Sequence, residues 1–271
     1  MQLSFIISLI AGCALTVYGM MDGGNLSNFI SWSSMAITFG GTFATTAMSF
    51  PAADFKAIPS HFKMLFFKQK YDPKEYIAKI VDYAQDARRK GLLALEDKAR
   101  QDDDEFLRNC VMLIVDAIEP SKAREMLENE LSCLEDRHNK SCQIYEKAAT
   151  FAPAFGMIGT LVGLINMLKG LNMSSGDAAT TLGQGMSVAL ITTFYGSVLA
   201  NLILMPIANR LRAINAKEML CKEIVVEGVL AIHEGTNPRH IEERLKAYVH
   251  SKNREGVSGN DNNEPKKKKK K

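Results

Sequence analysis

The sequence predicts an all-α, polytopic membrane protein with four transmembrane helices and a helical soluble part. Four apolar runs contain no Asp, Glu, Lys or Arg, and each is long enough to cross ~30 Å of hydrocarbon as a helix. No segment shows the alternation typical of a strand, and no repeat appears at a solenoid period. The basic residues are strongly segregated from these runs. The predicted spans are residues 3–20, 29–50, 151–168 and 183–209.

Residues 1–50 are predicted to form the first transmembrane hairpin. The run at 3–20 lacks the basic start and the small-residue cleavage site of a signal peptide, so we expect an uncleaved helix. Turn-forming residues follow at 22–25. The run at 29–50 begins near Trp32, whose indole suits a membrane interface, and ends before Pro51.

Residues 51–150 have the composition of a soluble, helical cytoplasmic domain. The first of its amphipathic segments is predicted to lie along the membrane surface. Pro73 is suited to the first turn of a helix, and Gly91 is expected to end that helix. We expect helices at 53–67, 73–90, 92–100, 103–117 and 123–150, the last continuing into the third span.

Residues 151–209 are predicted to form a second transmembrane hairpin that lines an ion path. Small and hydroxyl residues interrupt both of its apolar runs, which favours close helix packing or a polar path. Gly159 and Gly163 form a GxxxG pattern, a weakly specific packing motif. Pro153 and Pro206 each delete a helical hydrogen bond, which allows a hinge or only a static bend.

The C-terminal part is predicted to be a cytoplasmic helical extension at residues 210–250, with helices at 210–232 and 238–249. Residues 251–271 are polar and end in a lysine run, which predicts a disordered basic tail. The tail either contacts anionic lipid or is simply solvated.

The distribution of basic residues predicts the orientation. Residues 51–150 hold 17 Lys and Arg and residues 210–271 hold 15, so that 32 of the 33 lie in these two segments. The positive-inside rule places both segments in the cytoplasm. With four spans, both termini are then cytoplasmic. The nearly balanced formal charge of +3 indicates no nucleic-acid partner.

The predicted spans contain no acidic side chain, although ion-driven machines usually keep one in the membrane. Either the chain moves no ions, as a passive membrane scaffold would, or a partner helix supplies the acid. In the second case Thr160, Thr192 and Thr193 could orient that acid or coordinate a cation. Alternatively, these threonines only bond backbone carbonyls or pack helices.

No enzyme activity is expected. The chain has no Walker A, GxGxxG, GxSxG or HExxH motif, and its five histidines lack the spacing of metal ligands. Five scattered cysteines without a CxxC motif argue against a disulfide framework or a zinc site. We therefore expect no cofactor.

A dense charged segment, ARRKGLLALED, surrounds Gly91 and contains Arg88, Arg89 and Glu96. Such a segment is either a solvated face or a docking surface, because exposed charges stabilise weakly but steer association.

Several motifs together resemble the MotA/PomA family, the stator subunit of the bacterial flagellar motor. They are TFGGTFATTAMSFP in the second span, ARRKGLLALED in the soluble loop, APAFGMIGTLVGLINML in the third span, MSVALITTFYGSVLANLILMPIANRL in the fourth, and EGTNPRHIEERL near the end. The resemblance covers nearly the whole chain except the tail. It implies a multi-pass protein of the bacterial inner membrane.

The resemblance also implies roles and partners. Arg88 and Glu96, with Arg89 beside them, match the charged residues that engage the rotor protein FliG, and Pro153 and Pro206 match prolines implicated in torque. Thr160 and Thr193 match ion-path threonines. The missing acid would be an Asp on the single transmembrane helix of a MotB partner, with a pentamer of this subunit around a MotB dimer.

Two further alternatives remain open. The related ExbB/TolQ group, which energises envelope processes, shares the third and fourth spans but typically has three spans. The coupling ion is either H⁺ or Na⁺: hydroxyl oxygens suit a desolvated cation, as in sodium-type PomA chains, yet similar threonines occur in proton-driven chains. Of the two ions, the proton is favoured.

Overall fold

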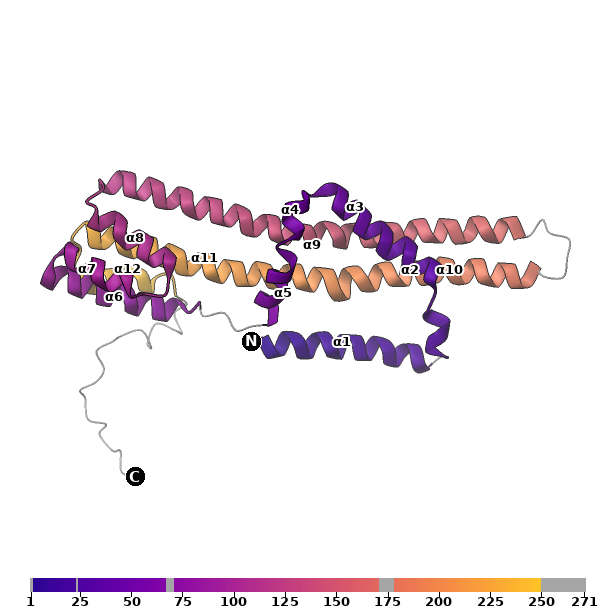
Figure 1. The fold of residues 1–271 in the computed structure, drawn as a ribbon. Coiled ribbons are helices and arrows are strands. Elements are labelled where there is room, and N and C mark those ends of the chain that lie inside the picture. Colours follow the sequence, from indigo (N-terminus) through magenta and orange to yellow (C-terminus); the bar gives the residue numbers. More distant parts are fainter. Residues whose placement is uncertain (1, 23, 67–70, 171–177, 250–271) are drawn as a thin grey trace, which may run out of the picture. The chain divides into compact units, whose positions relative to one another are not determined.

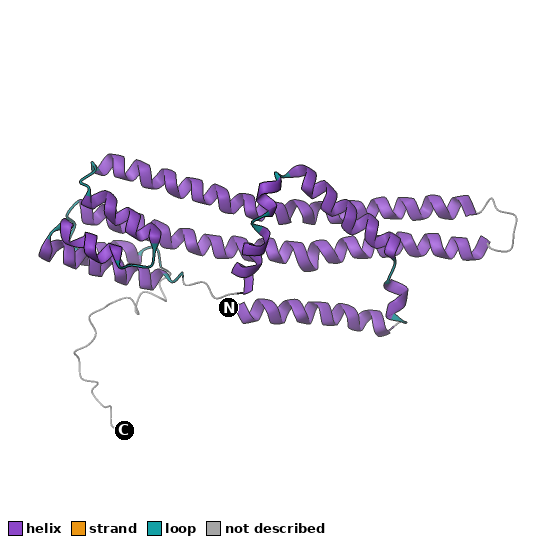
Figure 2. Cartoon of the chain, in the orientation of Figure 1, coloured by secondary structure: helices purple, strands orange, loops and turns teal. Residues whose placement is uncertain are grey.

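The computed structural model describes residues 2–22, 24–66, 71–170 and 178–249. Within this part of the chain all regular structure is helical, as the sequence predicts (Figures 1 and 2). The chain divides into two compact units. The first unit comprises Met1–Gln69 and His138–Ala213, and the second comprises Lys70–Arg137 and Ile214–Lys271. The predicted disordered tail at 251–271 lies outside the described residues.

The first unit begins with α1 (Gln2–Asp22), which is apolar and largely exposed. A 3₁₀ turn, η1 (Leu26–Phe29), follows it. The second apolar run is helical from Trp32 to Ser49 and starts after Ser31, whose side chain accepts a hydrogen bond from the Ser34 amide. This run consists of α2 (Trp32–Met35), a π-helical segment η2 (Ala36–Gly40) and α3 (Gly41–Ser49).

The amphipathic segment after Pro51 differs from the single helix expected at 53–67. Two short helices form instead, α4 (Ala52–Phe55) and α5 (Ile58–Phe66). Pro59 gives the physical reason. Because proline has no amide hydrogen, it is tolerated in the first turn of α5 but could not continue the hydrogen bonding of α4.

The longest helix is α9 (Pro120–Gly170), which contains Pro153 without a break. It passes from the second unit into the first, as the predicted continuation of 123–150 into the third span requires. In the first unit it lies beside α10 (Ala178–Val198), which continues through the π-helical η4 (Leu199–Leu204) into α11 (Met205–His233) (Figure 1).

Among the described residues, three helices are long and apolar enough to cross a membrane: α1, α9, and the continuous helix from α10 to α11. The run at 29–50 is not among them, because the π segment divides it into short helices. The fourth span therefore stays a prediction.

The second unit contains short helices arranged around the ends of α9 and α11. Asp72 caps α6 (Pro73–Lys90) by accepting a hydrogen bond from the Lys74 amide, 3.1 Å away, and Gly91 ends this helix with a φ of 84°. Side-chain caps of this kind satisfy amides that have no partner inside the helix. The other helices are η3 (Leu92–Ala94), α7 (Leu95–Arg100), α8 (Glu105–Val115) and α12 (Pro238–Lys246).

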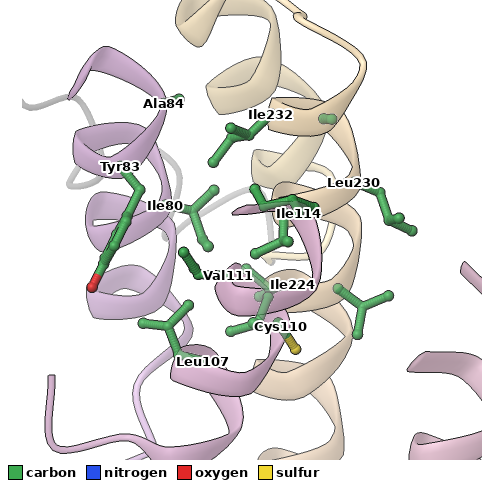
Figure 3. Packing of buried hydrophobic residues seen from close by; sticks show 14 of the residues in the cluster. Ile80, Tyr83, Ala84, Leu107, Cys110, Val111, Ile114, Ile224, Leu230 and Ile232 are labelled. Atoms are coloured by element: carbon green, nitrogen blue, oxygen red, sulfur yellow. The ribbon is translucent and has the colours of Figure 1, made fainter. Parts of the chain in front are cut away.

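One hydrophobic core holds the second unit together (Figure 3). Ile80 of α6, Leu107 and Ile114 of α8, and Ile224 of α11 are fully buried in it. Burying one such side chain contributes roughly 1.5–3 kcal/mol. The core fixes the position of α6, which carries Arg88 and Arg89 near its end.

Candidate functional site

The helices α9 and α10 approach each other through small residues. A Cβ atom at Gly159 would lie 2.4 Å from the Thr192 side chain, and one at Gly163 would lie 2.5 Å from the Gly185 carbonyl oxygen. At Gly196 it would lie 2.6 Å from the Ala152 carbonyl oxygen. Any larger side chain at these positions would push the helices apart. Both glycines of the predicted packing motif thus lie in this contact.

The second apolar run packs against one side of this helix pair. Phe155 of α9 fills the space above Gly41, where a Cβ would lie only 2.1 Å from the ring. Thr38 donates a hydrogen bond to the Thr192 carbonyl oxygen, 3.4 Å away. Tyr195 of α10 donates one to the Phe29 carbonyl oxygen. This side of the pair is therefore covered by the same chain.

The opposite side of the pair is exposed. Successive side chains of an α-helix point about 100° apart around its axis. In this antiparallel pair, the residue directly after each contact residue therefore points to the same side of the pair on both helices. Among these residues, Met157 is 62% exposed and Leu190 is 63% exposed. We call this side the open face. It consists of Pro153, Met157, Thr160 and Leu164 on α9, and Met186, Leu190, Thr193 and Ser197 on α10.

The structure places only two of the three predicted ion-path threonines on the open face. Thr160 and Thr193 lie there, and their hydroxyls donate to backbone carbonyls of their own helices, those of Met157 and Ala189. Thr192 is fully buried inside the subunit instead. Its hydroxyl donates to the Val188 carbonyl oxygen, 2.9 Å away. The three threonines therefore do not form one continuous wall.

A polar stripe lies next to Thr193; the sequence marked Asn201 only as one of several polar interruptions of the apolar run, and did not predict the stripe. Ser197 and Asn201 are exposed and follow Thr193 at intervals of four residues, and the Asn201 amide donates to the Ser197 carbonyl oxygen, 3.1 Å away. The sequence feature that could have indicated this stripe is the occurrence of a Ser and an Asn, four residues apart, in an apolar run. The π turn at η4, which no sequence pattern indicated, positions Asn201.

The two prolines lie at different kinds of position. Pro153 is half-buried within the continuous α9, beside the Gly196 contact. Pro206 is the second residue of α11 and follows the π-helical η4 directly. Proline cannot donate the next helical hydrogen bond, and a π turn is one way to accommodate that loss.

The predicted docking residues lie on two helices of the second unit. Arg88 and Arg89 are exposed near the end of α6, whereas Glu96 lies on α7, on the other side of Gly91. Glu96 pairs with Arg100 at 2.6 Å.

The two docking helices are joined by an ion-pair cluster. The Lys98 ammonium on α7 lies 2.6 Å from the Asp82 carboxylate and 2.5 Å from that of Asp86, both on α6. The hydrogen bond from Lys98 lowers the pKa of Asp86. The cluster therefore sets the position of Glu96 relative to Arg88.

No group of three or more potential metal ligands exists in the described part of the chain. Its long apolar helices, together with an exposed face that carries hydroxyls but no acid, give the first unit the character of a membrane protein. Comparison with known proteins identifies the family.

Residues 98–224 match the MotA/TolQ/ExbB proton channel family. Motility protein A of Treponema phagedenis is 38% identical over 254 residues, which are 94% of this chain and 96% of the relative. The uncharacterized protein YtxD of Bacillus subtilis is 38% identical over 245 residues, 89% of this chain and 88% of the relative. Chemotaxis protein PomA of Vibrio alginolyticus is 34% identical over 249 residues, 92% of this chain and 96% of the relative.

Solved structures agree with these relatives. The flagellar MotAB stator complex from Bacillus subtilis contains a chain that superposes with a TM-score of 0.82 at 32% identity, covering 94% of this chain and 98% of that one. A chain of C. jejuni MotAB gives 0.82 at 27% identity, covering 93% and 97%. The chain therefore belongs to the MotA/TolQ/ExbB proton channel family, and within it to the flagellar stator subunits of the motility protein A type.

Proposed function

We propose that this chain forms an ion path together with a MotB-like partner and converts ion flow into torque on the flagellar rotor. The open face carries the proposal. It presents the hydroxyls of Thr160, Thr193 and Ser197 on an exposed and mainly apolar surface, and no acid is present in either apolar run. A partner helix with a membrane Asp would cover this face and complete the site.

The proposed assembly is a pentamer of this subunit around a dimer of the partner. The MotAB composition of the solved relatives supports the partner. The proposed topology has four spans and both termini in the cytoplasm, which the distribution of Lys and Arg supports. Such a subunit needs no cofactor beyond its coupling ion.

The proposed coupling ion is the proton, with Na⁺ as the alternative. The description of the family as proton channels favours H⁺. Hydroxyl oxygens could also replace part of the hydration shell of Na⁺. Swimming speed, measured while the Na⁺ and H⁺ gradients are varied independently, separates the two ions.

Torque is proposed to reach the rotor protein FliG through Arg88, Arg89 and Glu96. The exposure of both arginines and the placement of Glu96 on a separate, clamped helix support a docking surface of fixed geometry. Pro153 and Pro206 are proposed to permit the bending that couples the open face to this surface.

The test is expression of this chain with its own partner in a motile host that lacks stators. We expect motility to return, and to be lost when the partner's membrane Asp is changed to Asn. A partner with a TonB- or TolR-like character, in place of a peptidoglycan-binding module, would contradict the proposal and favour an ExbB/TolQ-like energiser. Full function of a Thr160→Val, Thr193→Val double variant would favour a passive scaffold.

A further inference from the structure

A cavity of about 130 Å³ lies in the first unit, away from the open face. Its walls come from the second apolar run, from α4 and α5, from α9 and from η4. Thr42, Thr46, Tyr145 and Ala148 are among the lining residues. A cavity of this size in an apolar environment is large enough for a small hydrocarbon group.

All polar groups of the lining side chains are directed away from the cavity. Thr42 donates its hydroxyl proton to the Thr38 carbonyl oxygen at 2.6 Å, and Thr46 donates to the Thr42 carbonyl oxygen at 2.7 Å. The Tyr145 hydroxyl lies 3.3 Å from His61 Nδ1. Water would find no hydrogen-bonding partner there, so the cavity suits hydrocarbon.

The depth of the cavity fits the cytoplasmic leaflet. It reaches from Phe55 and Ile58, on the amphipathic segment, to residues 39–46 of the second apolar run. At 1.5 Å per residue, a helix that ends near Pro51 places these residues roughly 8–18 Å along the span. This step rests on the proposed topology, in which that end of the run faces the cytoplasm.

Two lysines lie beside the cavity lining, and one acid, Asp54, precedes Phe55. Lys56 is exposed and lies in the chain between Phe55 and Ile58, and Lys147 is exposed and precedes Ala148. The neighbouring acid Glu146 is already paired with Arg212. Basic side chains at a cytoplasmic membrane surface attract anionic head groups.

The apolar surface continues from the cavity to the outside of the subunit. Phe43, which lines the cavity, is 71% exposed. We propose that the cavity binds an acyl chain of an anionic phospholipid from the cytoplasmic leaflet, with its head group near Lys56 and Lys147. Such a lipid would fix α5 against α9.

The test uses the complex of this chain with its partner, reconstituted in nanodiscs. One set contains phosphatidylglycerol with a photoactivatable group in the acyl chain, and a matched set contains phosphatidylcholine with the same group. We expect cross-links on peptides that contain Phe43 or residues 144–148, at least threefold stronger for phosphatidylglycerol. Ala148→Phe and Ile58→Trp, which fill the cavity, should each reduce these cross-links at least fivefold.

Ala14→Phe on the exposed side of α1 is the matched control and should leave labelling unchanged. Lys56→Gln with Lys147→Gln should remove the preference for phosphatidylglycerol while the acyl cross-links persist. Unchanged labelling in both cavity-filling variants, equal labelling by the two lipids, or cross-links to a second copy of this chain in place of lipid would overturn the proposal. Motility of the unmodified complex is scored separately. If this complex is labelled by the lipid but does not support motility, the result counts against the stator function and leaves the lipid site standing.

Discussion

Two adjacent threonines have opposite surroundings, and this contrast gives a residue-scale test. Thr193 lies on the open face, whereas Thr192 is buried against Gly159. We expect Thr193→Val to reduce swimming speed severalfold, because it removes a hydroxyl from the proposed path. Thr192→Val should change speed little, since the hydrogen bond from Thr38 is accepted by the backbone carbonyl of residue 192, which remains.

Swimming speed and the amount of membrane-inserted protein are measured together for both variants. Equal speeds for the two variants at equal protein levels would argue against a path along the open face. A larger loss for Thr192→Val would instead place the path inside the subunit.

His61 gives a pH-dependent prediction at the same scale. Its pKa lies below the ordinary value of 6.5, first because burial disfavours the charged ring and second because His138 is nearby. The unfolded chain therefore takes up a proton at higher pH than the folded chain. The contribution of His61 to the free energy of unfolding should be constant above about pH 6.5 and should become less favourable as the pH is lowered from there towards the folded pKa.

The melting temperature of the purified complex between pH 8 and pH 5.5 measures this effect. His61→Gln can still bond the Tyr145 hydroxyl and should have a weaker dependence over that range. If the variant showed the same slope as the unmodified chain, another group would be responsible.

At the scale of elements, the contact of α9 with α10 depends on glycine. A Cβ at Gly163 would meet the Gly185 carbonyl, a backbone atom that cannot swing aside, whereas at Gly19 of α1 it would meet nothing within 4 Å. We expect Gly163→Ala to destabilise the subunit by about 1–3 kcal/mol through overpacking. Gly19→Ala should be nearly neutral.

Thermal stability of the detergent-solubilised complex compares these two variants. An equal shift of the melting temperature in Gly163→Ala and Gly19→Ala would show that the helix contact does not depend on the glycine at position 163.

The clamp between α6 and α7 predicts an effect on docking. Lys98→Ala removes both ion pairs to α6 and should cost about 1 kcal/mol, the upper end for partly exposed pairs. It should also lower swimming speed, because Glu96 is no longer held relative to Arg88. The matched control is Lys122→Ala, which breaks the exposed pair with Glu119 at 3.6 Å. Equal swimming speeds of the two variants would show that the clamp does not matter for docking.

Sequence patterns predicted most of the elements but not their irregularities. Apolar periodicity and the signals at Pro73 and Gly91 indicated the helices of the second unit, because caps and turns act locally. The π segments η2 and η4 were not predicted, because no local sequence signal such as a cap or a turn residue marks them.

The sequence predicted the residue types of the candidate site but not the side of the helix to which each side chain points. Thr192 and Thr193 look equivalent in the sequence, because both are hydroxyls in one apolar run. Only the packing of the second run on one side of the α9–α10 pair distinguishes them. The same packing defines which residues form the open face.

At the scale of the whole molecule, the chain is a stator-type subunit that we propose carries one half of an ion site. Its basic residues are segregated from its apolar runs, and its open face carries hydroxyls without an acid. The central claim is that ion flow along this face, completed by a partner carboxylate, drives rotation.

Rotation of tethered cells that carry only this chain and its partner tests that claim most directly, with the transmembrane H⁺ and Na⁺ gradients collapsed first one at a time and then together. The account predicts that rotation stops when the H⁺ gradient is collapsed and persists when only the Na⁺ gradient is removed. Rotation that continues with both gradients collapsed would contradict it.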